Sequence, residues 1–168
     1  MPDAEGLPQW FALRTRSRHE KLVRDRLARQ GVEHLLPTLT RLSQWKDRRK
    51  AIELPLFSGY CFARFSWQDR LPVLMVPGVV TIVSSGARPE PIPEAEIDAL
   101  KILITSALSY DAHPYLKEGM TVKVIRGPLE GVRGILLRKD KRYRLVLSVH
   151  LIKQAAAVEM DAADVIPI

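Results

Sequence analysis

The spacing of hydrophobic positions changes once along the chain. Up to residue 108, segments with helical spacing alternate with short extended segments, whereas beyond residue 118 apolar side chains recur at every second position. A period of two is typical of strands that bury one face. The polar stretch 109–117 separates the two patterns. We therefore expect an N-terminal domain at residues 1–108, a linker at 109–117 and a C-terminal domain at 118–168.

The first half begins with a short strand at residues 10–13, followed by a basic helix. Ser17 and Glu20 have the spacing of a capping box, which predicts the start of this helix. Val23 and Leu27 then fall on one face, and Gly31 predicts its end. One face of this helix should therefore pack against the core, while the opposite face presents cations.

The remaining elements of the first half also follow from hydrophobic pattern and from breakers. Residues 58–65 predict a strand with Tyr60 and Phe62 on the same face, and 67–75 a short helix. The β-branched run 79–83 is typical of a buried strand. A helix is expected after Pro93, running to about Leu108, with a wide apolar face formed by Ile97, Leu100, Ile102, Leu103, Ile104 and Leu108. These elements predict an α+β fold, with an antiparallel sheet and flanking helices in the N-terminal domain.

The last fifty or so residues predict a small closed β-barrel. Gly127 suits a tight turn with positive φ, while Gly131 and Gly134 would let strands bend around a narrow barrel. The apolar positions that alternate are Val122, Val124, Ile135, Leu137, Leu145, Leu147, Val149, Val158 and Met160.

Composition narrows the setting in which the protein works. No apolar run reaches the ~18 residues needed to cross a bilayer, and the acidic start of the chain is unlike a signal peptide. The single cysteine, Cys61, has no internal partner for a disulfide. We therefore expect a cytoplasmic protein without a membrane partner, and a monomer.

Charge points to a polyanionic neighbour such as nucleic acid. Lys and Arg number 26 against 19 Asp and Glu, which gives a formal net charge of +7. Basic side chains cluster in residues 14–29, 46–50 and 138–144. For each cluster, a solvated loop or helix face is the alternative interpretation.

The sequence contains no constellation typical of an enzyme. The histidines are scattered, and His19-Glu20 lacks the second histidine of a metalloprotease helix. The glycines 127, 131 and 134 belong to the barrel pattern and form no phosphate-binding loop. Cys61 lies between aromatic residues in a strand, where a small core residue is expected. We predict no catalytic residue, no metal site and no cofactor.

Two ordered sets of residues resemble a known family. Residues 119–135, Gly-Met-Thr-Val-Lys-Val-Ile-Arg-Gly-Pro-Leu-Glu-Gly-Val-Arg-Gly-Ile, resemble the KOW motif, which occurs in SH3-like barrels of transcription and ribosomal proteins. The N-terminal series, with its Trp-Phe-Ala-Leu, Phe-Ser-Gly-Tyr and Val-Pro-Gly-Val segments at 10–13, 57–60 and 76–79, resembles the NGN domain of the NusG family. Together the resemblance covers residues 8–168.

The resemblance implies a non-enzymatic transcription elongation or antitermination factor. In this family the NGN domain binds the clamp helices of the largest RNA polymerase subunit through an apolar pocket, and thereby suppresses pausing. The corresponding positions here are Trp10, Tyr60, Phe62, Ile97 and Leu100. Ordinary core residues are the alternative interpretation of each position, so the function requires that this aromatic-lined pocket be open to a foreign coiled coil.

Within the family the chain is similar to RfaH and to paralogues specialised for polysaccharide operons. Residues 26–30 are similar to the segment of RfaH that contacts non-template DNA, so the resemblance implies DNA contacts at Arg16, Arg26, Arg29 and Gln30. Pro77 replaces a DNA-contacting arginine of RfaH, which argues against a shared target sequence. RfaH presents a polar triplet to the opposite side of the polymerase cleft. Asp69-Arg70-Leu71 replaces that triplet here, so Arg70 is only a weak candidate for the same contact.

The barrel partner is less well defined by the resemblance. Leu151-Ile152-Lys153-Gln154-Ala155 stands where general NusG has a Phe-Gly-Arg loop that engages termination factor Rho or a ribosomal protein. Ile152 takes the aromatic position and the glycine is missing, which puts Rho binding in doubt and leaves a ribosomal protein open. Residues 151–166 also have good helix propensity, so refolding into a helical hairpin, as in RfaH, is a hypothesis that circular dichroism would test.

A ribosomal or ribosome-assembly protein that binds RNA through the KOW barrel is the alternative function. It accounts for the basic charge but not for the ordered N-terminal set. Binding to the isolated clamp-helix coiled coil, as against ribosomal RNA, would discriminate the two.

Overall fold

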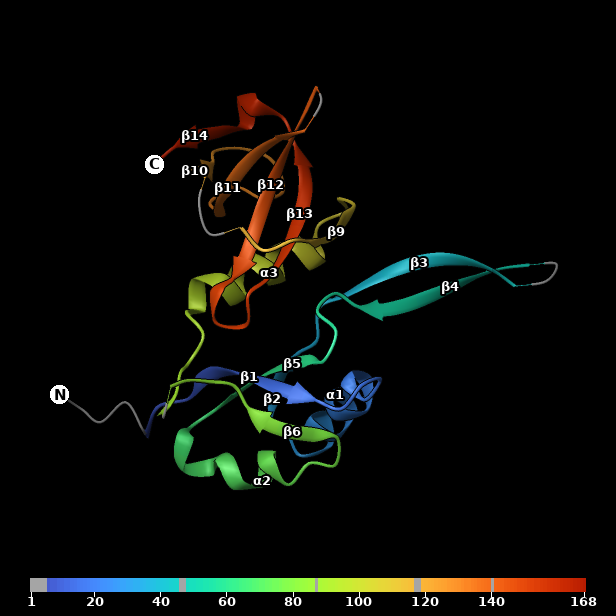
Figure 1. Ribbon diagram of the computed structural model, residues 1–168, viewed down its shortest axis with the longest axis vertical. Helices are drawn as coiled ribbons and strands as arrows, with labels where there is room; N and C mark the ends of the chain where they lie inside the picture. Colours follow the sequence, from blue (N-terminus) through green and yellow to red (C-terminus); the bar gives the residue numbers. More distant parts are fainter. Residues whose placement is uncertain (1–5, 46–47, 87, 117–118, 140) are drawn as a thin grey trace. The chain divides into compact units, whose positions relative to one another are not determined.

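The chain forms two compact units, one ending at Ile92 and the other beginning at Pro93. The computed structural model describes residues 6–45, 48–86, 88–116, 119–139 and 141–168 (Figure 1). The first unit combines helices with an antiparallel sheet, and the second is built mainly on a larger antiparallel sheet. This arrangement confirms the predicted α+β class.

The first unit is organised around a four-stranded antiparallel sheet with the order β2-β5-β1-β6. Strand β1 is central and pairs with β5 from Gln9↔Phe65 to Arg14↔Tyr60. On its other edge β1 pairs with β6, with a shift in register between Arg14 and Thr15. The strands are β1 (Gln9–Thr15), β2 (Glu33–Leu35), β5 (Tyr60–Phe65) and β6 (Val79–Ile82).

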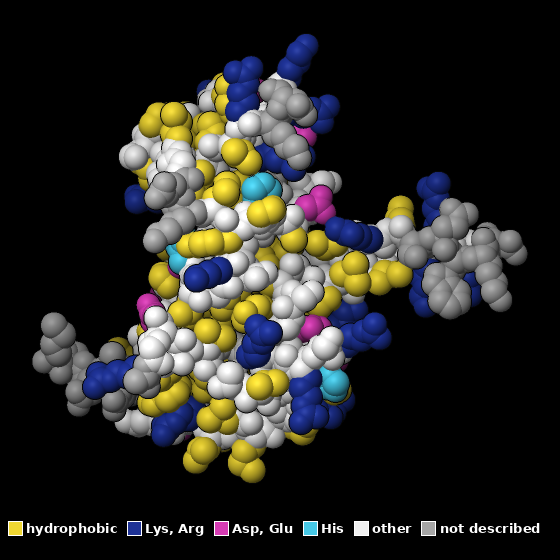
Figure 2. All heavy atoms as spheres, viewed as in Figure 1, with side chains coloured by type: hydrophobic (Ala, Val, Ile, Leu, Met, Phe, Trp, Pro, Cys, Tyr) yellow, Lys and Arg dark blue, Asp and Glu magenta, His cyan; other side chains and the backbone are white. Residues whose placement is uncertain are grey.

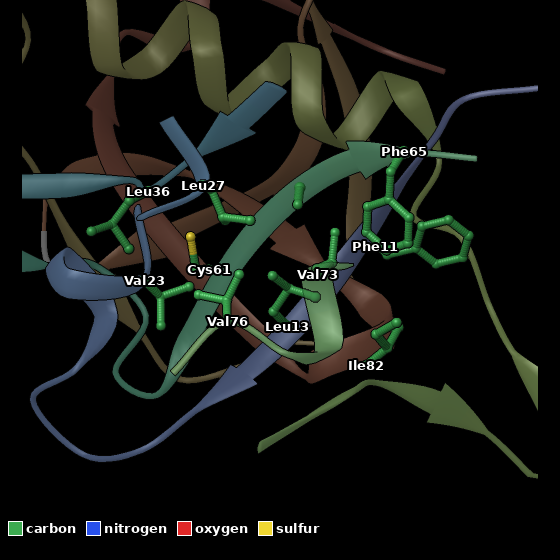
Figure 3. Packing of buried hydrophobic residues seen from close by; sticks show 11 residues of the cluster. Phe11, Leu13, Val23, Leu27, Leu36, Cys61, Phe65, Val73, Val76 and Ile82 are labelled. Atoms are coloured by element: carbon green, nitrogen blue, oxygen red, sulfur yellow. The ribbon is translucent and has the colours of Figure 1, made fainter. Parts of the chain in front are cut away.

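Two α-helices supply side chains to the core on one face of this sheet. Helix α1 (Glu20–Arg29) contributes Val23 and Leu27, and α2 (Arg70–Leu74), preceded by the 3-10 turn η2 (Trp67–Asp69), contributes Val73. These side chains meet Phe11, Leu13, Cys61, Ala63, Phe65, Val76 and Ile82 (Figure 3). Burial of this cluster is the main stabilising term of the first unit, because buried apolar side chains each contribute roughly 1.5 to 3 kcal/mol.

A two-stranded hairpin projects from the first unit between β2 and β5 (Figure 1). It consists of β3 (Thr38–Trp45) and β4 (Arg48–Pro55), paired from Thr38↔Pro55 to Trp45↔Arg48. A smaller hairpin, β7 (Ser84–Ser85) with β8 (Arg88–Pro89), follows β6.

The second unit begins with α3 (Glu94–Thr105) and continues as a six-stranded antiparallel sheet with the order β14-β10-β11-β12-β13-β9. Helix α3 packs against β12. The strands are β9 (Tyr110–His113), β10 (Met120–Val124), β11 (Arg133–Lys139), β12 (Arg142–Val149), β13 (Gln154–Met160) and β14 (Val165–Pro167). Short 3-10 turns, η3 (His150–Ile152) and η4 (Ala162–Asp164), join the last strands.

Several local predictions are corrected by the structure. The N-cap of α1 is His19, without a side-chain capping bond, so the expected capping box of Ser17 and Glu20 is absent. The Glu20 carboxylate instead accepts a 3.1 Å hydrogen bond from the backbone N–H of Gly59. Most of the run at 79–83 forms β6, which is an edge strand and not a buried one: β6 stands at the end of the sheet order among the described strands, and Val80 is 58% exposed.

The segment between the two sequence patterns also differs from expectation. Helix α3 ends at Thr105, and its buried residues are Ile97, Leu100 and Leu103, with Ile104 only half-buried. Part of the segment expected as a linker is strand β9, which pairs with β13. The stretch with helix propensity at 151–166 contains β13 and is extended in this structure.

Candidate functional site

Strands β1 and β5 present a second face on the side of the sheet opposite the α1 and α2 core. Because side chains alternate along a strand, Phe11 and Leu13 enter the core while Trp10 and Ala12 lie on the other face. Antiparallel partners share a face, so Phe62 lies beside Ala12, as the register shows. We call this surface the second face; its members on β1 and β5 are Trp10, Ala12, Arg14, Tyr60, Phe62 and Arg64.

The centre of the second face is apolar. Trp10 is 3% exposed and Phe62 is fully buried. The ring of Phe57, just before β5, packs edge-on against Phe62 with ring centroids 6.3 Å apart. Backbone bonding holds Trp10 as well, since its carbonyl accepts a 2.8 Å hydrogen bond from Ile92 N–H. Trp10, Tyr60 and Phe62, which the sequence singled out, thus share one face of two adjacent strands.

The edge of the second face is polar. Arg14 Nη1 donates a 2.8 Å hydrogen bond to the hydroxyl of Tyr60, and the guanidinium carbon lies 5.1 Å from the centroid of the tyrosine ring. Tyr60 is half-buried. At the other end Arg64 pairs with Glu33 of β2 at 3.3 Å. An apolar centre with cations and a tyrosine at its edge has the composition of protein-binding surfaces.

Two of the five predicted pocket residues lie in the second unit. Ile97 and Leu100 are on α3, where they are 0% and 1% exposed. Within its own unit, Glu96 Oε1 of α3 accepts a 2.8 Å hydrogen bond from the backbone N–H of His150 in the turn η3. The pocket was expected to be open, but Trp10, Phe62, Ile97 and Leu100 are buried and only Tyr60 reaches the surface.

The four expected DNA contacts lie on α1 (Arg26 and Arg29), at its C-cap (Gln30) and on the segment before it (Arg16). Arg16, Arg29 and Gln30 are exposed, whereas Arg26 is half-buried and its Nη1 donates a 2.6 Å hydrogen bond to the carbonyl of Pro77. The backbone N–H of Arg16 donates a 2.9 Å hydrogen bond to the carbonyl of Gly78. The guanidinium of Arg26 thus contributes to the fold.

Arg24 is a structural residue that sequence reasoning did not single out. Its guanidinium pairs with Glu53 of β4 at 2.8 Å and with the neighbouring Asp25 at 3.2 Å. The hydrogen bond to Glu53 raises the pKa of Arg24 above its ordinary value. The contact joins α1 to the hairpin across 29 positions of sequence, and no local pattern encodes such a pairing.

The barrel glycines adopt the special geometry that the motif requires. Gly127 and Gly131 have φ of +91° and +88°, which favours glycine at turns. A Cβ on Gly134 would lie 2.6 Å from the carbonyl oxygen of Val146, so this glycine permits the close approach of β11 and β12. In the expected partner loop Ile152 is only 5% exposed, whereas Lys153 is exposed with φ of +51°.

Among the described residues, no group of three or more His, Cys, Asp or Glu side chains is placed to hold a metal ion. Cys61 is buried, and desolvation raises the pKa of its thiol to about 12, so it carries almost no nucleophilic thiolate at neutral pH. In the part of the chain that the structure describes, no helix is long and apolar enough to span a membrane.

Known proteins share both the sequence pattern and the fold. The family model for transcription termination factor NusG matches residues 8–101, which is more than half of the chain. The chain belongs to the NusG family. The protein is therefore a transcription termination/antitermination factor of this family.

Two individual relatives span nearly the whole chain. Transcription termination/antitermination protein NusG of Rickettsia bellii is 23% identical over 169 residues, covering 94% of this chain and 88% of the relative. The structure solved for domain interaction in Thermotoga maritima NusG is 22% identical, with a TM-score of 0.58, and covers 98% of this chain and 99% of that one. The second similarity establishes the common fold.

Proposed function

We propose that this NusG-family protein binds the clamp helices of the largest subunit of bacterial RNA polymerase and suppresses pausing or termination. The observation that carries the proposal is the second face of the first unit, where Trp10, Tyr60 and Phe62 lie on adjacent strands. These are the positions that the resemblance assigns to the polymerase-binding pocket. Aromatic side chains in desolvated pockets contribute most of the energy in interfaces that receive a helix.

The burial of Trp10 and Phe62 limits how a partner can reach this face. A coiled coil can contact Tyr60 directly, since it is half-buried, but it contacts Phe62 only after neighbouring side chains move. Binding through this face therefore includes a conformational step, and the apparent affinity falls by the fraction of molecules that are competent to bind.

Non-template DNA would be bound beside the polymerase by the basic helix α1. Arg16, Arg29 and Gln30 supply exposed groups for this contact, and Arg26 has other guanidinium N–H groups besides the one that bonds to Pro77. Arginine neutralises phosphates, and arginine and glutamine can also read base edges. Pro77 stands where RfaH has an arginine, so the preferred DNA sequence should differ from that of RfaH.

The second unit would recruit a further protein through the loop at 151–155. Because Ile152 is buried, Lys153 is the residue that a partner meets in this loop. The aromatic-glycine pattern of the general NusG loop is missing, which puts Rho binding in doubt and leaves a ribosomal protein as the open candidate.

The proposal is tested by binding of the full chain to the purified clamp-helix coiled coil, measured by calorimetry. Tyr60→Ala should weaken binding by about 2 kcal/mol, or roughly 30-fold, as loss of an aromatic anchor does. Tyr60→Phe keeps the ring and loses only the hydroxyl that accepts from Arg14, so it should stay within about fivefold of the original affinity. Leu71→Ala, on an exposed position of α2, is the control with no expected effect.

Two results would decide against this function. Coiled-coil binding that is absent, or equal for Tyr60→Ala and Leu71→Ala, would remove the second face as the polymerase site. Tight binding of ribosomal RNA without capture of the coiled coil would support the alternative of an RNA-binding ribosomal or ribosome-assembly protein.

A further inference from the structure

The hairpin of β3 and β4 is an exposed two-stranded ribbon outside the core of the first unit. Its described side chains are mostly exposed, and only a few near its base are half-buried. The hydrogen bond from Leu56 N–H to the carbonyl of Pro37, 2.8 Å long, closes its base. Figure 2 shows Lys and Arg side chains gathered along this projection. A ribbon that is exposed along most of its length adds little buried apolar surface, which suggests a role in contact with a partner.

The pairing register separates the cations of the hairpin onto different faces. Arg48 and Lys50 are two positions apart on β4 and share a face with Arg41, whose partner is Ile52. We call this the cationic face. Arg49, which lies between Arg48 and Lys50 in sequence, is on the opposite face, together with Leu42, Ala51 and Glu53.

The opposite face is also partly engaged within the protein. Glu53 accepts the 2.8 Å hydrogen bond from Arg24 of α1, which holds this side of the ribbon toward the helix. The charge of Glu53 further reduces the positive potential there. The cationic face has no acidic residue among its described side chains, which include Leu39, Arg41, Lys50, Ile52 and Leu54.

We propose that the cationic face of the hairpin binds duplex DNA by lying along a groove. The major groove of B-DNA is ~12 Å wide and admits a two-stranded β-ribbon. Residues on one face of a strand recur every ~7 Å, so Arg48 and Lys50 can each reach a separate phosphate of a backbone that rises ~3.4 Å per nucleotide. Both side chains are exposed.

The same geometry separates DNA from other polyanions. The major groove of A-form RNA is deep and narrow and does not admit such a ribbon. Duplex DNA is therefore the nucleic acid whose shape and charge this ribbon fits.

This inference concerns an element other than those of the proposed function. It involves neither the second face nor Arg16, Arg29 and Gln30 on and beside α1, and it requires no polymerase. The two proposals can therefore fail separately.

The test is the fluorescence anisotropy of a labelled DNA duplex of about three helical turns, titrated with the full chain at several NaCl concentrations. Arg48→Gln and Lys50→Gln should each weaken binding several-fold at 100 mM salt and reduce the slope of log K against log[salt] by ~0.9. Arg49→Gln removes the same charge from between them, on the opposite face, and is the matched control. It should stay within twofold of the original protein, with an unchanged slope.

Two further measurements identify the type of nucleic acid and separate this inference from the proposed function. An RNA duplex of the same sequence should bind several-fold more weakly and should not discriminate Arg48→Gln from Arg49→Gln. Capture of the clamp-helix coiled coil should be unaffected by all three substitutions, since β3 and β4 form a sheet of their own, separate from the sheet that contains Tyr60.

Clear outcomes would overturn the inference. Equal losses for Arg48→Gln, Lys50→Gln and Arg49→Gln would mean that only net charge attracts DNA. Unchanged DNA affinity in all three would exclude the hairpin as the contact. RNA binding as tight as DNA binding, with the same dependence on Arg48 and Lys50, would identify an RNA surface instead.

Discussion

The guanidinium of Arg26 donates a 2.6 Å hydrogen bond to the carbonyl oxygen of Pro77. The bond joins the middle of α1 to the turn that precedes β6, across 51 positions of sequence. Arg29, one helical turn later, remains exposed. Two arginines that the family resemblance treats alike therefore have different physical roles, and stability and binding measurements should separate them.

Replacing Arg26 should cost stability where replacing Arg29 does not. Arg26→Ala removes the hydrogen bond to Pro77 and should lower the free energy of unfolding by about 1 kcal/mol. Arg29→Ala changes an exposed position and should stay within about 0.5 kcal/mol. Both substitutions exchange arginine for a good helix former, so helix propensity does not confound the comparison. Urea denaturation followed by circular dichroism measures both, and equal midpoints would contradict the role assigned to Arg26.

Arg29 and Arg16 should instead determine the salt dependence of DNA binding in elongation complexes. If each contacts a phosphate, Arg16→Gln or Arg29→Gln should reduce the slope of log K against log[salt] by roughly 1. Gln30→Ala removes no charge and should lower affinity without changing that slope. The measurement is retention of the protein on stalled elongation complexes over a salt series, and an unchanged slope for both arginine variants would remove them from the DNA site.

Cys61 should be unreactive while the protein is folded. Burial raises the pKa of its thiol from 9.0 to about 12, so the thiolate is scarce at pH 8. An aromatic disulfide reagent should therefore modify Cys61 only slowly in native protein and within minutes in denaturant. Between pH 9 and about 12 only the unfolded state ionises this thiol, so its contribution to stability is complete below pH 9 and is lost as the pH rises through that range. Rapid modification of the native protein would contradict this burial.

Gly134→Ala should destabilise the second unit. The added Cβ would lie 2.6 Å from the carbonyl oxygen of Val146 and 3.0 Å from side-chain atoms of Leu145 and Leu147. Overpacking of this kind costs about 1 to 3 kcal/mol. Gly6→Ala, where the new Cβ meets nothing within 4 Å, is the control. Thermal unfolding should show a lower midpoint for Gly134→Ala alone, and equal midpoints would mean that β11 and β12 separate without cost.

Local patterns in the sequence predicted most of the regular elements. Apolar spacing placed Val23 and Leu27 in the core, and glycines with positive φ marked the barrel turns at 127 and 131. These features are encoded within a few residues, because a helix face or a tight turn depends on side chains close in sequence. The identification of the family rested on several such segments in the right order.

The hairpin of β3 and β4 was not predicted. Its basic stretch at 46–50 was interpreted as a possible loop or helix face, since a ribbon exposed on both sides lacks the apolar-polar alternation that marks a strand. The described part of that stretch begins β4. A cluster of charges in the sequence does not indicate which side of a ribbon each residue occupies. The register shows that Arg48 and Lys50 lie on one face of the hairpin and Arg49 on the other.

Contacts between residues distant in sequence could not be predicted from local patterns either. The hydrophobic pattern predicted that α3 is an apolar helix. It did not indicate that Leu103 is buried while Ile104 is only half-buried, or that α3 packs against β12. The capping box at Ser17 failed because the Glu20 carboxylate bonds to Gly59, a residue 39 positions away. In each case a partner distant in sequence decided the outcome.

The hydrogen bond between Leu56 and Pro37, at the base of the hairpin, has an evolutionary consequence. The chain leaves and re-enters the sheet of the first unit at one point, so the segment between these residues can change length without altering β2 or β5. Each residue pair added to both strands would extend the ribbon by ~3.4 Å. Homologous proteins can thus acquire a longer, shorter or differently charged arm by insertion or deletion at this site, and adjust their reach toward a template while the rest of the domain is inherited intact.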